Sequence, residues 1–171
     1  IALFQIKLET KDEEPYIFMF YPPHLESSQL QILIEILIDP VIIKIIHGGE
    51  ALDIPYLFSE LLKDINKHKS FCKNLFDTRY LCEYYNLDNK LIEKKFKIYY
   101  LLKQMNVIND KEFEYLLNNE EKMGSISEIR IDVNNMSEEL IIYCAYDVLY
   151  LSDLYNSFPK KFVYQKLIPE I

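Results

Sequence analysis

Residues 41–58 read VIIKIIHGGEALDIPYLF and contain the clearest signals for the architecture of the chain. Its β-branched run, 41–46, is typical of a short buried strand, and the glycine pair 48–49 predicts a turn directly after the strand. We expect a helix to follow over about 50–66. Open α/β sheets bind their ligands at the carboxyl ends of strands. The residues around this turn are therefore candidates for a functional site.

The sequence on both sides of this stretch alternates in the same way. Residues 1–8 (IALFQIKL) and 16–21 (YIFMFY) flank a polar turn and predict a β-hairpin. Ser27 or Ser28 is expected to cap a helix that ends near Ile38, before Asp39-Pro40. A short strand over 74–76 ends at Asp77, and a helix begins at Thr78. A hairpin followed by alternating strands and helices predicts a layered α/β domain.

The second half of the chain is expected to contain two helical segments around a polar stretch. Residues 90–117 are expected to be helical, and the polar residues 118–135 read as a loop or an insertion. Ser137 then caps a last helix, with two glutamates in its favourable first turn. This helix is expected to reach about Ser157, because Pro159 follows.

Length and charge limit the class of protein. The chain has 171 residues, enough for one domain, with 19 basic and 27 acidic side chains and a net charge of −8. Residues 60–103 are net positive, with 10 basic and 6 acidic side chains. Such a segment either offers a basic surface to a polyanion or forms an ordinary solvated helix face. Apolar runs are too short for a membrane span. Three cysteines without paired spacing and no secretory signal indicate an intracellular protein, cytoplasmic or nuclear.

The last helix carries the most informative spacing. Tyr143 and Asp147 are four residues apart, so a phenol and a carboxylate project from the same helix face. The surrounding residues 140–154 are strongly apolar, and a carboxylate in such a stretch needs either solvent or a partner. An exposed Asp on an ordinary amphipathic helix is the competing interpretation.

The strand ends supply the other candidates, and each has a simpler structural interpretation. Asp53 follows the glycine turn, where an acid also stabilises the start of a helix. His47 ends the strand, where a histidine is more often structural than functional. Asp77 ends the next strand, and its simplest role is to cap the helix that follows.

Taken in order, these segments resemble the 3′–5′ exonucleases with four acidic residues and a tyrosine, the DEDDy group, in its ribonuclease D and nuclear-exosome branch. The segment HGGEALDIPYLF resembles the second exonuclease motif, and YCAYDVLYLSDLY resembles the third, Tyr-x-x-x-Asp. IALFQIKL and YIFMFY resemble the family's hairpin, and NLFDTRYLCEYYN its following strand and helix. The resemblance covers about residues 1–157.

The chain departs from the family pattern in three places. The first motif, Asp-x-Glu, lies on a strand before the IALFQIKL-like strand, so its acids are absent, and we expect a single domain over 1–171 that is shortened at its N-terminus. Asp53 lies six positions after His47, one more than in the pattern, which leaves Glu50 as the runner-up for the second-motif acid. The interval before the third motif is long, which indicates an insertion around 104–135.

The resemblance implies a ribonuclease H-like, three-layer fold with a mixed central sheet flanked by helices, here without its first strand. It implies two divalent ions, Mg²⁺ or Mn²⁺, with Asp53 and Asp147 as ligands and Tyr143 orienting the attacking water. By the same match, Asp53, Tyr143 and Asp147 are the catalytic residues, and His47, Gly48 and Gly49 are expected to contact substrate. The implied substrate is the 3′ end of single-stranded nucleic acid, RNA rather than DNA.

Two other interpretations stay open at this point. The domain is a catalytically inactive exonuclease fold that binds nucleic acid or protein, or it is an α/β domain without any link to nucleic acid. The residues upstream of Ile1 separate the first of these from an enzyme, because an active member needs Asp-x-Glu there.

Overall fold

The structure is a computed structural model that describes residues 3–91, 96–125, 129 and 131–160. Short strands come first along the chain, and helices dominate the second half. The elements are β1 (Phe4–Leu8), β2 (Tyr16–Phe20), η1 (Pro22–His24), α1 (Ser27–Ile38), β3 (Lys44–Ile46), α2 (Asp53–Tyr56), η2 (Leu57–Leu62), α3 (Ile65–Phe71), β4 (Leu75–Asp77), α4 (Thr78–Asp88), α5 (Ile98–Gln104), α6 (Asp110–Met123), α7 (Glu138–Leu149) and α8 (Leu151–Ser157).

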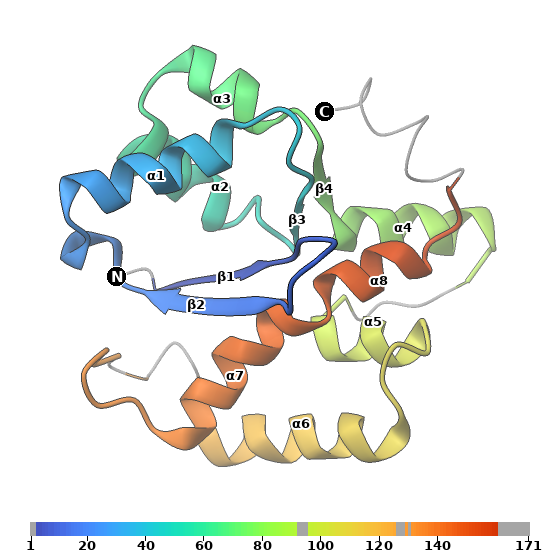
Figure 1. Cartoon of the computed structure of the whole chain (residues 1–171). Coiled ribbons are helices and arrows are strands. Elements are labelled where there is room, and N and C mark those ends of the chain that lie inside the picture. Colours follow the sequence, from blue (N-terminus) through green and yellow to red (C-terminus); the bar gives the residue numbers. More distant parts are fainter. Residues whose placement is uncertain (1–2, 92–95, 126–128, 130, 161–171) are drawn as a thin grey trace.

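Helices lie on both sides of the strands. Figure 1 shows α1, α2 and α3 on one side and α5, α6 and α7 on the other. This arrangement confirms the expected α/β fold class. The strands form small sheets that lie between the helices.

The strands form two separate pairs. β1 and β2 make the predicted antiparallel hairpin, with Phe4 opposite Phe20 and Leu8 opposite Tyr16. β3 and β4 are parallel, with Ile46 opposite Asp77. A single mixed sheet was expected, but within the described residues no strand pairs with the second edge of β1 or of β3. Figure 1 shows β1 on the side of the hairpin toward β3, so these two unpaired edges border the space between the pairs.

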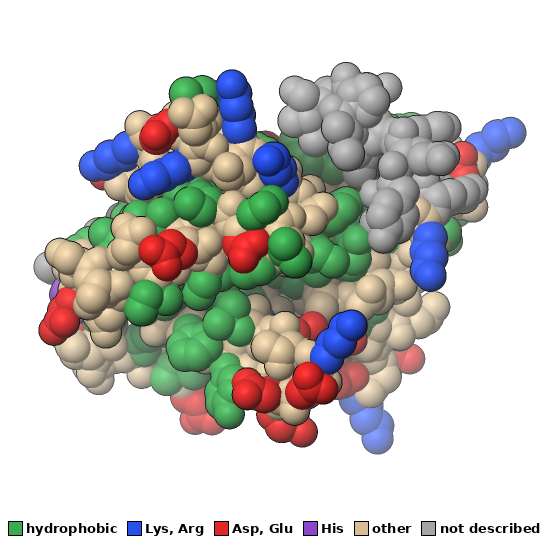
Figure 2. Space-filling view, turned by 45° about the horizontal axis from the view of Figure 1, so that its top comes forward, with side chains coloured by type: hydrophobic (Ala, Val, Ile, Leu, Met, Phe, Trp, Pro, Cys, Tyr) green, Lys and Arg blue, Asp and Glu red, His purple; other side chains and the backbone are tan. Residues whose placement is uncertain are grey.

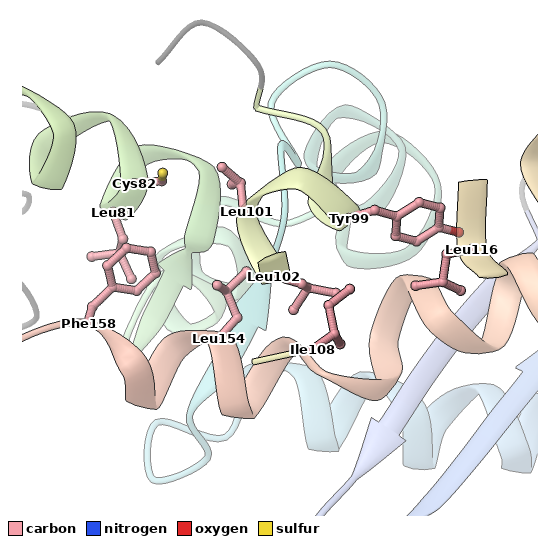
Figure 3. Close-up of a cluster of buried hydrophobic side chains, with 9 residues drawn as sticks. All are labelled: Leu81, Cys82, Tyr99, Leu101, Leu102, Ile108, Leu116, Leu154 and Phe158. Carbon is pink, nitrogen blue, oxygen red and sulfur yellow. The ribbon is translucent and has the colours of Figure 1, made fainter. Parts of the chain in front are cut away.

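Two clusters of buried side chains hold the layers together. One joins α1, η2 and α3 through Leu33, Ile34, Leu57, Leu61, Leu62 and Phe71. The other joins α4, α5, α6 and α8, and Figure 3 shows its side chains meeting between these helices: Leu81, Cys82, Tyr99, Leu101, Leu102, Ile108, Leu116, Leu154 and Phe158. Each buried aliphatic side chain contributes roughly 1.5–3 kcal/mol of hydrophobic stabilisation. The site described below lies on elements that these two clusters fix.

The strand predicted over 41–46 is shorter than expected. Only Lys44–Ile46 is extended and paired, whereas Val41 is 82% exposed and Ile43 is 53% exposed. The apolar run therefore overstated the buried segment. The helix before it ends as predicted at Asp39, but its cap is Glu26 and not a serine. The side chain of Gln29 accepts the backbone N–H of Glu26 at 2.9 Å, closing a capping box.

The single helix predicted over 50–66 is wrong in two ways. The glycine turn extends to Leu52, so α2 begins at Asp53. The chain then continues through the π-helical turn η2 and breaks at Lys63, which has a left-handed φ of 40°. Asp64 restarts the helix by accepting the backbone N–H of Asn66 at 2.7 Å.

The second half has more breaks than the sequence suggested. The helix predicted over 90–117 contains α5 and the start of α6, separated by a turn in which Asn106 has a φ of 57°. Residues 92–95 of that prediction lie outside the described residues. Helix α6 runs on to Met123, into the stretch expected to be a loop, and the last helix is divided at Tyr150 into α7 and α8.

In the described part of the chain, every helix is too short or too polar to cross a bilayer. The expected cytoplasmic or nuclear location stays a prediction.

Candidate active site

Helix α7 carries the two residues of the Tyr-x-x-x-Asp spacing, and both of its ends are fixed. Ser137 caps its start by accepting the backbone N–H of Leu140 at 3.2 Å, as predicted. The side chain of Asn119, on α6, donates to the backbone carbonyl of Glu139 at 3.0 Å. Leu140 and Cys144 are buried along the inner face of the helix.

The other end of α7 is held by Lys7, which projects from β1. Its Nζ donates to the backbone carbonyl of Leu149 at 2.5 Å and forms an ion pair with Glu9. Ser152, at the start of α8, donates to Glu9 at 2.7 Å and completes the network. Lys7 therefore satisfies a terminal carbonyl of α7 and ties this helix to the hairpin.

The carboxylate of Asp147 is partly buried and sits in a negative environment. Its pKa is raised to about 7, chiefly by burial and further by the charges of Asp53 and Glu120, although hydrogen bonding to the Tyr143 hydroxyl opposes this rise. Burial and the neighbouring Asp147 also raise the pKa of Tyr143 well above its usual range. At neutral pH, Tyr143 is therefore a neutral phenol that donates to the carboxylate one helical turn away.

Asp53 begins α2 and lies close enough to Asp147 for its charge to be felt there. Although the residue is open to solvent, the protein around its carboxylate raises its pKa, and Asp77 and Glu50 add to this rise. The structure thus brings Asp53, Tyr143 and Asp147 into one neighbourhood from elements about 90 residues apart along the chain. Two neighbouring carboxylates with raised pKa values indicate negative charge that no cationic side chain among the described residues neutralises.

The glycine turn that precedes Asp53 is tied to the next strand by Asp77. One carboxylate oxygen of Asp77 accepts the backbone N–H of Gly48 at 2.9 Å, and the other accepts that of Gly49 at 2.9 Å. The first oxygen also accepts the N–H of Arg79 at 2.9 Å, which confirms the predicted helix cap. The two glycine N–H groups are therefore used inside the protein. Their contact with substrate stays a prediction.

Gly48 is required by the backbone, whereas Gly49 packs closely against a side chain of β3. Gly48 has a φ of 64°, a conformation that a residue with Cβ adopts at a cost. A Cβ on Gly49 would lie 2.4 Å from Cδ1 of Ile46, so this turn packs directly against β3. The carbonyl of Gly49 also accepts the N–H of Ile54, which sets the start of α2 and hence the position of Asp53.

Both ring nitrogens of His47 have partners. Nε2 donates to the backbone carbonyl of Phe96 at 2.8 Å, and Nδ1 lies 2.9 Å from the Thr78 hydroxyl. Burial lowers the pKa of His47, so the ring is neutral at pH 7 and Nδ1 accepts from that hydroxyl. The Thr78 hydroxyl also lies 3.1 Å from the carbonyl of Ile46, and its single proton serves one acceptor at a time. These contacts are structural, and a role of His47 toward substrate stays a prediction.

Glu50, the runner-up for the second-motif acid, is engaged elsewhere. Its carboxylate forms an ion pair with the guanidinium of Arg79, which also reaches Glu83 at 3.3 Å. Within the described residues Asp53 has no such cation, and its charge acts on Asp147. The geometry therefore favours Asp53 over Glu50 as the partner of Asp147.

Sequence reasoning missed two residues beside this site. Tyr99 is 4% exposed, and this burial raises its pKa, with a further contribution from the charge of Asp147. Glu120, on α6, acts on Tyr99, Tyr143 and Asp147 and is paired with Lys97 at 2.9 Å. No local spacing links these positions to the motif on α7, because only the packing of α5, α6 and α7 brings them together.

The donor set fits a divalent cation only in part. Hard carboxylate oxygens suit Mg²⁺ or Mn²⁺, and Asp53 and Asp147 provide them. In the part of the chain that the structure describes, however, no three His, Cys, Asp or Glu side chains gather as a metal site. The described residues alone therefore do not make up the two-ion centre that the resemblance implies.

Comparison with known proteins identifies the family. A model of the 3′–5′ exonuclease family matches residues 1–162, nearly the whole chain. The Uncharacterized protein L533 of Acanthamoeba polyphaga mimivirus is 34% identical over 168 residues, which cover 91% of this chain and 32% of that protein. The chain thus spans about a third of this relative's length. No solved structure matches the chain. The match to the family model confirms the resemblance to the exonucleases, whereas the ribonuclease D branch stays a prediction: the chain belongs to the 3′–5′ exonuclease family.

Proposed function

We propose that this domain removes nucleotides from the 3′ end of RNA by metal-dependent hydrolysis of the terminal phosphodiester. Asp53 and Asp147 hold the cations, and Tyr143 orients the water that attacks phosphorus. The bond between phosphorus and the 3′ oxygen of the preceding nucleotide breaks, that oxygen gains a proton, and a nucleoside 5′-monophosphate leaves.

The observation that carries this proposal is the convergence of Asp53 and Asp147, with the hydroxyl of Tyr143 on the second carboxylate. A carboxylate held near a pKa of 7 by burial and like charge is poorly stabilised while it stands alone. Divalent cations in this place would relieve that repulsion and would supply Lewis-acid stabilisation of the phosphate.

The raised pKa of Tyr143 assigns it a specific task. A phenol that keeps its proton at neutral pH does not remove a proton from water as a general base. Its hydroxyl donates to Asp147, and its oxygen keeps lone pairs that accept a hydrogen bond from a water molecule. Tyr143 therefore orients the nucleophile through its oxygen while its own proton holds the carboxylate.

The separation of the two strand pairs supports a proposal about where the two acids of the Asp-x-Glu motif would lie. The unpaired edges of β1 and β3 border the space where the resemblance places the strand with Asp-x-Glu. Unpaired backbone groups in such a position favour a further strand. We propose that this strand, in a longer form of the protein, adds two carboxylates to Asp53 and Asp147 and completes the donor set.

RNA is the proposed substrate because the segments HGGEALDIPYLF and NLFDT look closest to the RNA-processing branch of the family. The net charge of −8 does not oppose this, since bound cations would neutralise the phosphate at the site. DNA is the alternative within the same chemistry, and equal assays on both polymers separate the two.

The test is shortening of a 5′-labelled, single-stranded RNA with a free 3′ hydroxyl. A longer form of the protein that includes the upstream strand is compared, with Mn²⁺ or with EDTA, to the same protein carrying Asp147→Asn. We expect a ladder of products shortened from the 3′ end only with Mn²⁺ and the parent side chain. Equal digestion by the variant would refute the site assignment, and no digestion by either protein would favour an inactive binding module.

A further inference from the structure

Four lysines lie in and beside α3: Lys63, Lys67, Lys69 and Lys73. Three of them are exposed and Lys67 is half-buried. Figure 2 shows blue side chains gathered over the part of the molecule where α3 lies. Within 60–73 they are accompanied by two acids, Glu60 and Asp64, so this surface is net positive on a protein whose charge is −8. We call these four lysines the α3 basic surface.

The structure separates this surface from the rest of the basic segment 60–103. Arg79 is paired with Glu50 and Glu83, Lys97 with Glu120, and Lys103 with Asp110. None of the four lysines of the α3 basic surface forms an ion pair with another described residue. Within the described part of 60–103, the basic side chains without an ion pair are these four lysines and Lys90, so four of the five lie at α3.

This surface rests on a fixed support. The ring of His68 stacks on that of Phe58, with centroids 3.9 Å apart and an interplanar angle of 5°. Phe71 is 1% exposed and meets Phe58 edge-on at 5.9 Å. These contacts join the inner face of α3 to η2, directly after the helix that begins at Asp53. The helix backbone in and beside which the four lysines lie is therefore fixed against η2.

We propose that the α3 basic surface binds the sugar-phosphate backbone of the nucleic acid on the 5′ side of the scissile bond. This rests on the proposed function, which puts the 3′ end between Asp53 and Asp147. In Figure 1, α3 lies beyond α1 and α2 as seen from α7, so the strand reaches this surface only some nucleotides away from its 3′ end. Binding there is electrostatic and independent of base sequence.

The test measures equilibrium binding of a fluorescein-labelled, single-stranded oligonucleotide in EDTA, where hydrolysis is blocked, at several salt concentrations. The four lysines are replaced together by glutamine. Each lost phosphate contact reduces the magnitude of the slope of log K against log [salt] by ~0.7, so the four substitutions should reduce it by ~3 and weaken binding roughly 600-fold at 0.1 M salt. Replacement of all four by arginine should preserve both quantities.

A matched control replaces four other exposed lysines, Lys11, Lys111, Lys122 and Lys160, by glutamine. It removes the same charge, and we expect its slope to change by less than ~1. Equal effects of the two sets, or an unchanged slope in the α3 set, would overturn the proposal.

The binding assay also separates this proposal from the proposed activity. Because binding in EDTA needs no hydrolysis, a changed slope in a protein that digests no RNA supports the α3 basic surface while the proposed activity fails. Digestion of RNA together with an unchanged slope supports the activity and overturns the role of the α3 basic surface.

Discussion

Replacement of Asp77 by alanine should destabilise the domain by about three times as much as loss of an ordinary helix cap. Its carboxylate accepts three backbone N–H groups, each at 2.9 Å, from Gly48, Gly49 and Arg79. Loss of the cap at Arg79 costs about 1 kcal/mol. Each bond to the glycine turn contributes about 1 kcal/mol more, because the acceptor is charged and the site is only partly buried. The expected loss in free energy of unfolding is about 3 kcal/mol.

The structure offers a matched control for this measurement. Asp64 caps α3 through one bond, to the N–H of Asn66 at 2.7 Å, and makes no second side-chain tie to another described element. Asp64→Ala should therefore cost about 1 kcal/mol. The loss of stability caused by Asp77→Asn should lie between the losses caused by Asp64→Ala and Asp77→Ala. An amide keeps one acceptor oxygen but turns its NH₂ group toward a backbone donor.

The assay is urea unfolding of the parent and the three variants, followed by circular dichroism and supported by thermal unfolding. For a chain of this size, 1 kcal/mol corresponds to about 2–4 °C, so Asp77→Ala should lower Tm by about 6–12 °C and Asp64→Ala by about 2–4 °C. Equal losses for the two alanine variants would show that the hydrogen bonds between the glycine turn and Asp77 contribute nothing to stability.

Further predictions concern the site itself. In EDTA, an Asp147 with a folded pKa of about 7 binds more protons than the unfolded chain between pH 4 and 7, so its ionisation destabilises the fold as pH rises. The stabilising effect of Asp147→Asn, measured by thermal unfolding, should therefore grow from pH 5 to pH 8, and an effect constant with pH would contradict this. Tyr143→Phe should lower kcat by about 100-fold with little change in KM, because it removes the group that orients water. A rise in KM alone would point to substrate binding instead. Glu50→Gln should keep the hydrolysis rate within about twofold and cost under about 1 kcal/mol of stability, since its ion pair with Arg79 is exposed. A loss as large as that of Asp53→Asn would make Glu50 the second-motif acid.

Local signals predicted the elements that local interactions stabilise. The hairpin followed from two apolar runs around a polar turn, and the helix starts at Thr78 and Glu138 followed from the capping side chains of Asp77 and Ser137. The spacing of Tyr143 and Asp147 correctly put both side chains on one helical face. In each case the atoms that decide the structure lie within a few residues of one another.

Breaks and ties set by tertiary packing could not be predicted in this way. Lys63 adopts a left-handed conformation that its side chain does not favour, and the burial of Leu62 and Phe71 on either side of it holds the chain there. The apolar run at 41–46 predicts a longer buried strand than the structure contains, because Val41 is exposed. The bonds from Asp77 to the glycine turn join residues 28 and 29 positions apart, and no local pattern encodes them.

The functional roles predicted for Asp53 and His47 came from the resemblance to the exonucleases, not from composition or spacing. From the residues alone, Asp53 had a simpler role as a helix-start acid, and His47 as a structural histidine. The structure keeps Asp53 near Asp147 and gives His47 two internal partners. The contributions of Glu120 and Tyr99 became visible only with α5, α6 and α7 in place.

A double-mutant comparison of hydrolysis rates shows whether Asp53 and Asp147 act as one metal-dependent site. Rates of Mn²⁺-dependent RNA shortening are measured for the longer form of the protein with Asp53→Asn, with Asp147→Asn and with both. If the carboxylates work as a unit, each single variant loses roughly 1,000-fold or more and the double variant loses no more than the worse single one. Multiplied losses, or a single variant that retains the parent rate, would show that the two carboxylates do not form one site.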